Sequence, residues 1–251
     1  MAVLNLSFSA CGFMGIYQLG VLRAFLKHGK PMLRAVKGYA GASAGALVAT
    51  VLVTAPDRVE HCKEFTYRFA SEVRRQRLGA VTPGYDFMHA LREGIEEILP
   101  LDAHEIAGDR LHISITHSRT RRNHLVSHFA SREDLIKVLL ASSFVPLYAG
   151  IKAVEYQGQT WMDGGLTDSL PIFPVGRTIT VSPFSGPQDV CPRQAGLVNV
   201  RLKVANMNMM FSTENIIRLR RALFPATVKM RVAVSCQCGQ NPGCRFSRKN
   251  T

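Results

Sequence analysis

The segment Gly38–Pro56 contains no charged residue, and halfway along it the composition changes from Gly and Ser to aliphatic residues. A G-x-S-x-G motif, Gly41–Gly45, stands at this change, between an apolar run at Val36–Ala40 and another at Ala46–Val53. The segment is long enough to span a membrane, but its Gly/Ser-rich first half favours a buried strand, a tight turn and a buried helix. Because the run Ala46–Val53 is apolar on all sides, a helix formed by it is expected to be buried between other elements, which predicts a layered fold.

The rest of the chain continues this alternation of strands and helices. Apolar or alternating runs predict strands at Val3–Ser9, Leu111–Thr116, His124–Phe129, Ile151–Val154, Thr160–Met162 and Thr178–Pro183. Helical spacing predicts helices near Ile16–Leu26, Asp57–Arg77, Phe87–Leu99, Arg132–Ala141 and Thr213–Phe224. We therefore expect an α/β domain with mostly parallel strands, formed by a catalytic part at 1–186 and a C-terminal helical extension at 187–228. Residues 229–251 are expected to form a basic, loosely ordered tail.

The charge of the chain is unevenly distributed. Of the formal net charge of +13, residues 1–200 carry +4 and residues 201–251 carry +9. With 47% hydrophobic residues the chain is globular, and its cations lack the interleaved aromatic residues of a nucleic-acid surface. An anionic membrane or lipid-droplet surface is the expected partner of residues 201–251. The scattered cysteines and the absence of a basic segment before the first apolar run favour a cytoplasmic protein over a secreted one.

A serine in a G-x-S-x-G turn is a candidate nucleophile, because the flanking glycines Gly41 and Gly45 relieve crowding around Ser43. The nucleophile needs a base, and all eight histidines precede Asp163, which excludes a Ser–Asp163–His order. One alternative is a triad of an earlier acid, Asp102 or Asp109, with a later histidine. The other is a dyad in which Asp163 takes the serine proton directly. Two glycines follow Asp163 at the end of a predicted strand, so its carboxylate can project from a tight turn without crowding.

A glycine turn, Ala10-Cys11-Gly12-Phe13-Met14-Gly15, follows the first predicted strand. Backbone amides in such a turn can stabilise the oxyanion of an acyl intermediate or bind a phosphate. Ala10 interrupts the G-x-G-x-x-G pattern, and no Lys-Ser/Thr pair of a P-loop follows. Nucleotide binding is therefore disfavoured.

These three motifs, in this order, resemble the patatin-like phospholipase family. The resemblance is carried by the segments SFSACGFMGIYQLG, GASAGALVA, LGAVTPGYDF, SREDLIKVLLASSFVP and WMDGGLTDSLPI. It implies a three-layer fold with a central, mostly parallel sheet flanked by helices. It also implies Ser43 as nucleophile, Asp163 as proton acceptor and the amides of Gly12 and Phe13 as oxyanion hole. The supporting motif positions are Ala10, Cys11, Gly15, Gly41, Gly45, Gly164 and Gly165. Ala10 departs from the first family glycine, and Met14 from the basic residue of plant-type members.

The resulting expectation is a lipid acyl hydrolase that acts through an acyl-enzyme on triacylglycerol, retinyl ester or phospholipid, and also transfers acyl groups to acceptor alcohols. The alternative is a non-catalytic module that binds lipid surfaces with the same fold. No metal or organic cofactor is expected, and three tail cysteines, Cys236, Cys238 and Cys244, lack the histidine that would complete a zinc site. Met207, Met209, Met210 and Phe211 are expected to fill the core or to line an acyl-chain pocket.

Overall fold

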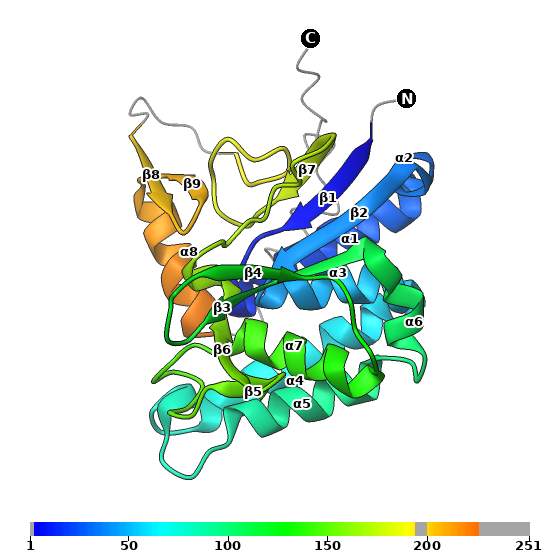
Figure 1. Ribbon diagram of the computed structural model, residues 1–251. Helices are drawn as coiled ribbons and strands as arrows, with labels where there is room; N and C mark the ends of the chain where they lie inside the picture. Colours follow the sequence, from blue (N-terminus) through cyan, green and yellow to red (C-terminus); the bar gives the residue numbers. More distant parts are fainter. Residues whose placement is uncertain (1–2, 194–199, 226–251) are drawn as a thin grey trace.

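The computed structural model describes residues 3–193 and 200–225 (Figure 1). The strands are β1 (Leu4–Phe8), β2 (Val36–Ala42), β3 (Leu111–His117), β4 (Asn123–Val126), β5 (Val154–Tyr156), β6 (Gln159–Asp163), β7 (Arg177–Val181), β8 (Arg201–Val204) and β9 (Met207–Met210). The α-helices are α1 (Gly15–His28), α2 (Lys30–Ala35), α3 (Ala44–Thr54), α4 (Val59–Arg75), α5 (Phe87–Ile98), α6 (Ala103–Ala107), α7 (Arg132–Ser143) and α8 (Thr213–Leu223).

Strands β1 to β7 form one mixed sheet in the order β5-β6-β3-β2-β1-β7, and β4 pairs with β3. β7, β1, β2 and β3 are parallel to one another, whereas β4, β5 and β6 join through antiparallel pairs. The central strands β1 and β2 are buried almost throughout, as expected for parallel strands covered on both faces. The loops after β1 and β2 consequently lie side by side at the carboxyl edge of the sheet, where ligands of open α/β sheets bind.

Helices cover the sheet in two successive layers (Figure 1). α3 packs on β1, β2 and β3, and α7 packs on β3, β5 and β6. α4 packs on α1, and α5 packs on α4 and α7, so this pair lies outside the first layer. α3 is buried along most of its length because of its apolar composition, whereas the strongly amphipathic α4 and α5 keep a polar face toward solvent.

The segment 200–225 packs against the edge of the domain through a small apolar cluster separate from the main core. β8 and β9 form an antiparallel hairpin, and α8 follows directly. Met207 and Met209 of β9 and Ala222 of α8 pack in this cluster with Cys11 and Met14 of the glycine turn. The C-terminal segment therefore lies against the loop after β1.

The predicted α/β class, with a mostly parallel sheet flanked by helices, is confirmed. The long helices lie close to their predicted positions, and Ser131 caps α7 by accepting a hydrogen bond from the Asp134 amide at 3.1 Å. The short helices α2 and α6 and the β8–β9 hairpin were not predicted, so the extension is not purely helical. The tail 229–251, with its three cysteines, lies outside the described residues. In the described ranges we find no helix with the length and apolar character needed to cross a bilayer.

Candidate active site

Ser43 occupies a sharp turn between β2 and α3. Its backbone has φ 54° and ψ −130°, a conformation that non-glycine residues rarely adopt. A Cβ atom on Gly45 would lie 2.3 Å from the carbonyl oxygen of Phe8, so only glycine allows α3 to approach β1 this closely. The motif thus places the Ser43 hydroxyl at the amino-terminal end of a buried helix, where negative charge is stabilised.

The strained turn is held by α7. The Ser43 amide donates a hydrogen bond to the Ser142 hydroxyl at 2.8 Å, and this hydroxyl donates to the Ser114 carbonyl at 2.7 Å. Ser142 is completely buried, so its hydroxyl connects α7, the turn and β3 without competition from water. This residue was not singled out from the sequence, although it lies within a segment that carries the family resemblance.

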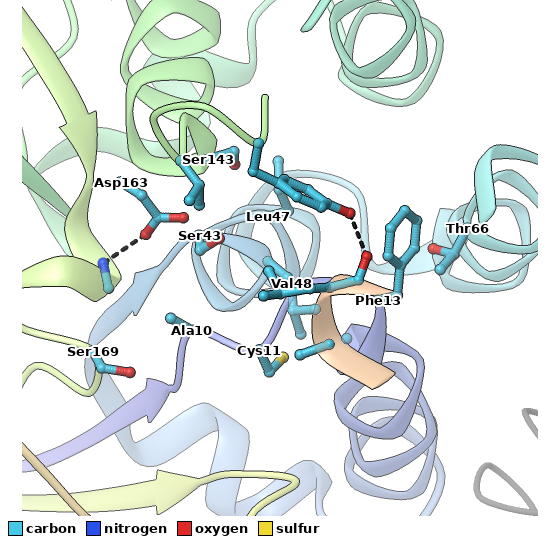
Figure 2. A pocket seen from close by; sticks show the side chains of 18 of the residues that line it. Ala10, Cys11, Phe13, Ser43, Leu47, Val48, Thr66, Ser143, Asp163 and Ser169 are labelled. Atoms are coloured by element: carbon cyan, nitrogen blue, oxygen red, sulfur yellow. Dashed lines mark hydrogen bonds between the residues drawn. The ribbon is translucent and has the colours of Figure 1, made fainter. Parts of the chain in front are cut away.

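The register of the sheet brings Asp163 to Ser43. Ala42 pairs with Ser114 on β3, so Ser43 follows at the level of Ile115. On the opposite side of β3, Ile115 pairs with Asp163, the last residue of β6. Figure 2 shows the Asp163 carboxylate directed toward Ser43. Two residues far apart in sequence therefore meet across one strand.

Asp163 is 3% exposed, and burial raises the pKa of its carboxyl group to about 7. Hydrogen bonds from the Ser43 hydroxyl and the Gly165 amide oppose this effect, the latter at 2.6 Å from Oδ1. A carboxylate with this pKa is a far stronger base than an exposed aspartate, because desolvation favours its protonated form. The buried group is thus suited to accept a proton near neutral pH.

The glycine turn lies beside this pair. Gly12 has φ +49°, and a Cβ atom there would lie 2.2 Å from the carbonyl oxygen of Ala222 on α8. The first backbone amide that donates within this turn is that of Met14, which donates to the Cys11 carbonyl. The amides of Gly12 and Phe13 come before Met14 in the chain. Amides at this position have no acceptor within a helical turn and can bind an anion.

Cys11 also lines the site, but burial, with a smaller contribution from the Asp163 charge, raises the pKa of its thiol well above the ordinary range. The thiol therefore stays protonated and does not compete with Ser43 as a nucleophile.

Ser43 and Asp163 lie in the wall of a cavity of about 740 Å³ (Figure 2). Its lining is mostly aliphatic and aromatic, from α3, α4, α5 and α8, and the described lining contains no histidine. Met207 and Met209 contribute to both the lining and the small cluster, whereas Phe211 is 55% exposed. A cavity of this size and polarity accommodates an acyl chain.

The structure brings together the predicted motif residues. Ser43, Asp163, Ala10, Cys11, Gly12, Phe13, Gly15 and Gly165 all line the cavity, whereas Gly41, Gly45 and Gly164 support it from the adjoining backbone. The alternative acids Asp102 and Asp109 lie around α6 and do not line the cavity. Within the described residues, no group of three or more His, Cys, Asp or Glu side chains is placed to hold a metal ion.

Comparisons with known proteins identify the family of this chain. A family model described as patatin-like phospholipase matches residues 6–175. The chain is 58% identical over 249 residues to human patatin-like phospholipase domain-containing protein 4, covering 99% of this chain and 98% of that protein. It is 37% identical over 246 residues to human patatin-like phospholipase domain-containing protein 2, covering 98% of this chain and 48% of that protein.

A further relative carries the name of an acyl-transferring enzyme. The chain is 35% identical over 221 residues to human omega-hydroxyceramide transacylase, covering 88% of this chain and 41% of that protein. The residues of this chain that the family model matches, 6–175, include the glycine turn, the serine elbow and the Asp163 turn. This chain therefore belongs to the patatin-like phospholipase family, one of whose members is named as a transacylase.

Proposed function

We propose that this protein is a lipid acyl hydrolase that uses Ser43 as nucleophile and Asp163 as proton acceptor. The observation that carries the proposal is the position of the Ser43 hydroxyl and the buried Asp163 carboxylate together in the wall of an apolar cavity. The Asp163 carboxylate is desolvated, as an aspartate must be if it is to take the serine proton directly. The described cavity lining contains no histidine that could serve as the base instead.

In this mechanism the Ser43 oxygen attacks the ester carbonyl while Asp163 takes its proton. The amides of Gly12 and Phe13 stabilise the negative oxygen of the tetrahedral intermediate. Asp163 then returns the proton to the departing alcohol, which leaves an ester between the acyl chain and Ser43. A water molecule or an acceptor alcohol attacks this ester in the same way and regenerates the free serine.

The substrate class is an ester of a long acyl chain. The apolar cavity supports this assignment, and triacylglycerol, retinyl ester and phospholipid are the candidates that the family resemblance implies. Transfer to an acceptor alcohol is the companion reaction, in line with the name of the transacylase relative.

We place the enzyme at an anionic membrane or lipid-droplet surface facing a reducing compartment. Within the described range 200–225 there are five Lys and Arg residues and one acidic residue, Glu214. Such an excess of positive charge attracts anionic headgroups. Cys11 and Cys62 are buried free thiols, which supports a reducing environment.

Labelling with a fluorophosphonate probe, which reacts with activated serines, tests the nucleophile. The parent protein is expected to be labelled, and Ser43→Ala is expected to lose labelling and ester hydrolysis together. Asp163→Asn is expected to lower kcat/KM by about 10²-fold or more, the contribution typical of a general base. Ser169→Ala serves as a control, because Ser169 also lines the cavity but lies away from the Asp163 carboxylate.

Undiminished labelling of Ser43→Ala would refute the nucleophile, and full activity of Asp163→Asn would refute the dyad. The non-catalytic alternative predicts a different result: the parent protein would bind lipid vesicles but show neither labelling nor hydrolysis on any of the three ester classes.

A further inference from the structure

The mouth of the cavity is surrounded by apolar side chains that face solvent. Six residues both line the cavity and are 40–58% exposed; we call them the apolar rim, and they are Leu166, Val204, Ile216, Leu219, Leu223 and Phe224. Single exposed apolar residues are common, but a group of them at one opening marks a surface that another apolar body covers.

A tight turn after α7 extends this surface. In the turn Val145–Ile151, Leu147 is 80% exposed and Ile151 is 93% exposed. Tyr148, between them, lines the cavity, and its hydroxyl donates a hydrogen bond to the Leu223 carbonyl of α8. The turn is thereby attached to the apolar rim, with its two aliphatic side chains directed into solvent.

The backbone conformation of the turn keeps Leu147 exposed. Leu147 has φ 69°, a left-handed conformation that is unusual for a bulky residue. Its amide donates to the Gly150 carbonyl at 2.8 Å, and the Ala149 amide donates to the Val145 carbonyl at 2.8 Å. Strain of this kind persists where surrounding contacts enforce it, and it occurs often at functional sites. The backbone therefore presents Leu147 outward at a cost in stability.

Positive charge accompanies the aliphatic side chains. Lys152, next to Ile151, is exposed, and Arg220 is exposed while it also lines the cavity. Aliphatic residues flanked by cations are the pattern of segments that insert into a bilayer with anionic headgroups. A bilayer also fits the position of this surface, because an apolar substrate can pass from it into the mouth without crossing water.

We propose that the turn Val145–Ile151 inserts Leu147 and Ile151 into an anionic lipid bilayer and so docks the mouth of the cavity on the membrane. The proposal rests on the proposed lipid-ester function, but it concerns binding and is measured without turnover. The turn would be a membrane-inserting element in addition to the basic residues within 201–251.

The test measures binding of the full chain, in a Ser43→Ala background, to vesicles of phosphatidylcholine with and without phosphatidylglycerol. The variant pair Leu147→Asn and Ile151→Ser removes both aliphatic chains, and Asn tolerates the left-handed conformation at position 147. We expect the pair to weaken partitioning onto anionic vesicles by about tenfold or more, since insertion of each aliphatic chain removes apolar area from water.

Ile172→Ser is the matched control. Ile172 is 57% exposed, but it lies shortly before β7, whose first residue pairs with the start of β1, at the opposite end of these strands from Ser43. This variant is expected to bind vesicles as the parent does. Ile151→Trp is expected to give a blue-shifted emission that brominated lipids quench, while Ile172→Trp shows no such change; Trp161→Phe removes the background signal in both.

Parent-like vesicle binding by the Leu147/Ile151 pair would overturn the proposal, as would an equal loss in Ile172→Ser. A parent protein that dimerises through these residues and does not bind vesicles would also overturn it, and would assign the surface to a second copy.

Hydrolysis of a water-soluble short-chain ester separates the two proposals: the Leu147/Ile151 pair with Ser43 restored should keep this activity. If labelling of Ser43 fails while vesicle binding depends on the turn, the proposed function fails and the docking surface stands.

Discussion

At the scale of single residues, the environment of Asp163 determines its chemistry. An exposed aspartate is a weak base for a serine hydroxyl, because its pKa lies near 4. Burial against the cavity raises the pKa of Asp163 to about 7, and hydrogen bonds from Ser43 and Gly165 limit the rise. The same carboxyl group on an exposed turn would not have this property.

This pKa predicts how activity depends on pH. The proposed base works only when ionised, so kcat/KM for a short-chain ester should rise as pH increases through about 7 and level off above it. Measurement on the parent protein between pH 5 and 9 checks this, with Asp163→Asn as the control in which the rise disappears. An activity that is already constant from pH 5 upward would show that no group of this pKa controls the reaction.

At the scale of elements, α7 links folding to the site. Its first turn is capped by Ser131, and its last turn carries Ser142, which holds the strained Ser43 amide at 2.8 Å. The helix therefore spans from a surface cap to the proposed nucleophile. Changes at its two ends are expected to have different consequences for catalysis.

Ser142→Ala leaves the Ser43 amide and the Ser114 carbonyl without their partner in a buried site, at a cost of about 1–3 kcal/mol. Ser131→Ala removes the cap at a cost of about 1 kcal/mol. Urea denaturation should show both variants to be destabilised, but only Ser142→Ala should lower kcat for a short-chain ester. Equal kcat values would mean that the hydrogen bond stabilises the fold without positioning Ser43.

At the scale of the whole molecule, the cavity runs between several helices. Phe87, Leu91, Ile95 and Ile98 line it along α5 over about 16 Å, at 1.5 Å per residue. Arg132, at the start of α7, donates to the Leu99 carbonyl at 3.0 Å, whereas Ser43 is bound at the far end of α7. The Ile98 end of the cavity is therefore remote from the proposed nucleophile.

Filling this remote end should shorten the chain that the cavity accepts. Ile98→Trp is expected to lower kcat/KM for a palmitoyl ester by about tenfold or more, because a long chain would have to leave the pocket. The same variant should hydrolyse a butyryl ester at the parent rate, which also controls for folding. Equal losses on both esters would show that the acyl chain does not follow α5.

Much of the local structure was predictable because it depends on neighbours in sequence. The apolar run of α3, the Ser131 cap and the amphipathic spacing of α4 and α5 each reflect a period or a capping rule. The β8–β9 hairpin carries no comparable signal, and Met207 and Met209 pack it on distant segments, whereas the short helix α2 packs on the preceding helix α1. In α8, the apolar residues Ile216 and Leu219 are half exposed at the mouth of the cavity, whereas Asn215 and Ala222 are buried.

The sequence by itself determined the family, the α/β class and the candidates Ser43 and Asp163, because the motifs and their order are properties of the chain. Only the tertiary structure decided how these residues are arranged. The pairing of β2 and β6 with β3 brings Asp163 to Ser43, burial raises the Asp163 pKa, and α7 supplies Ser142. Register, desolvation and contacts between distant segments are not written in any local pattern, because they depend on the packing of the whole fold.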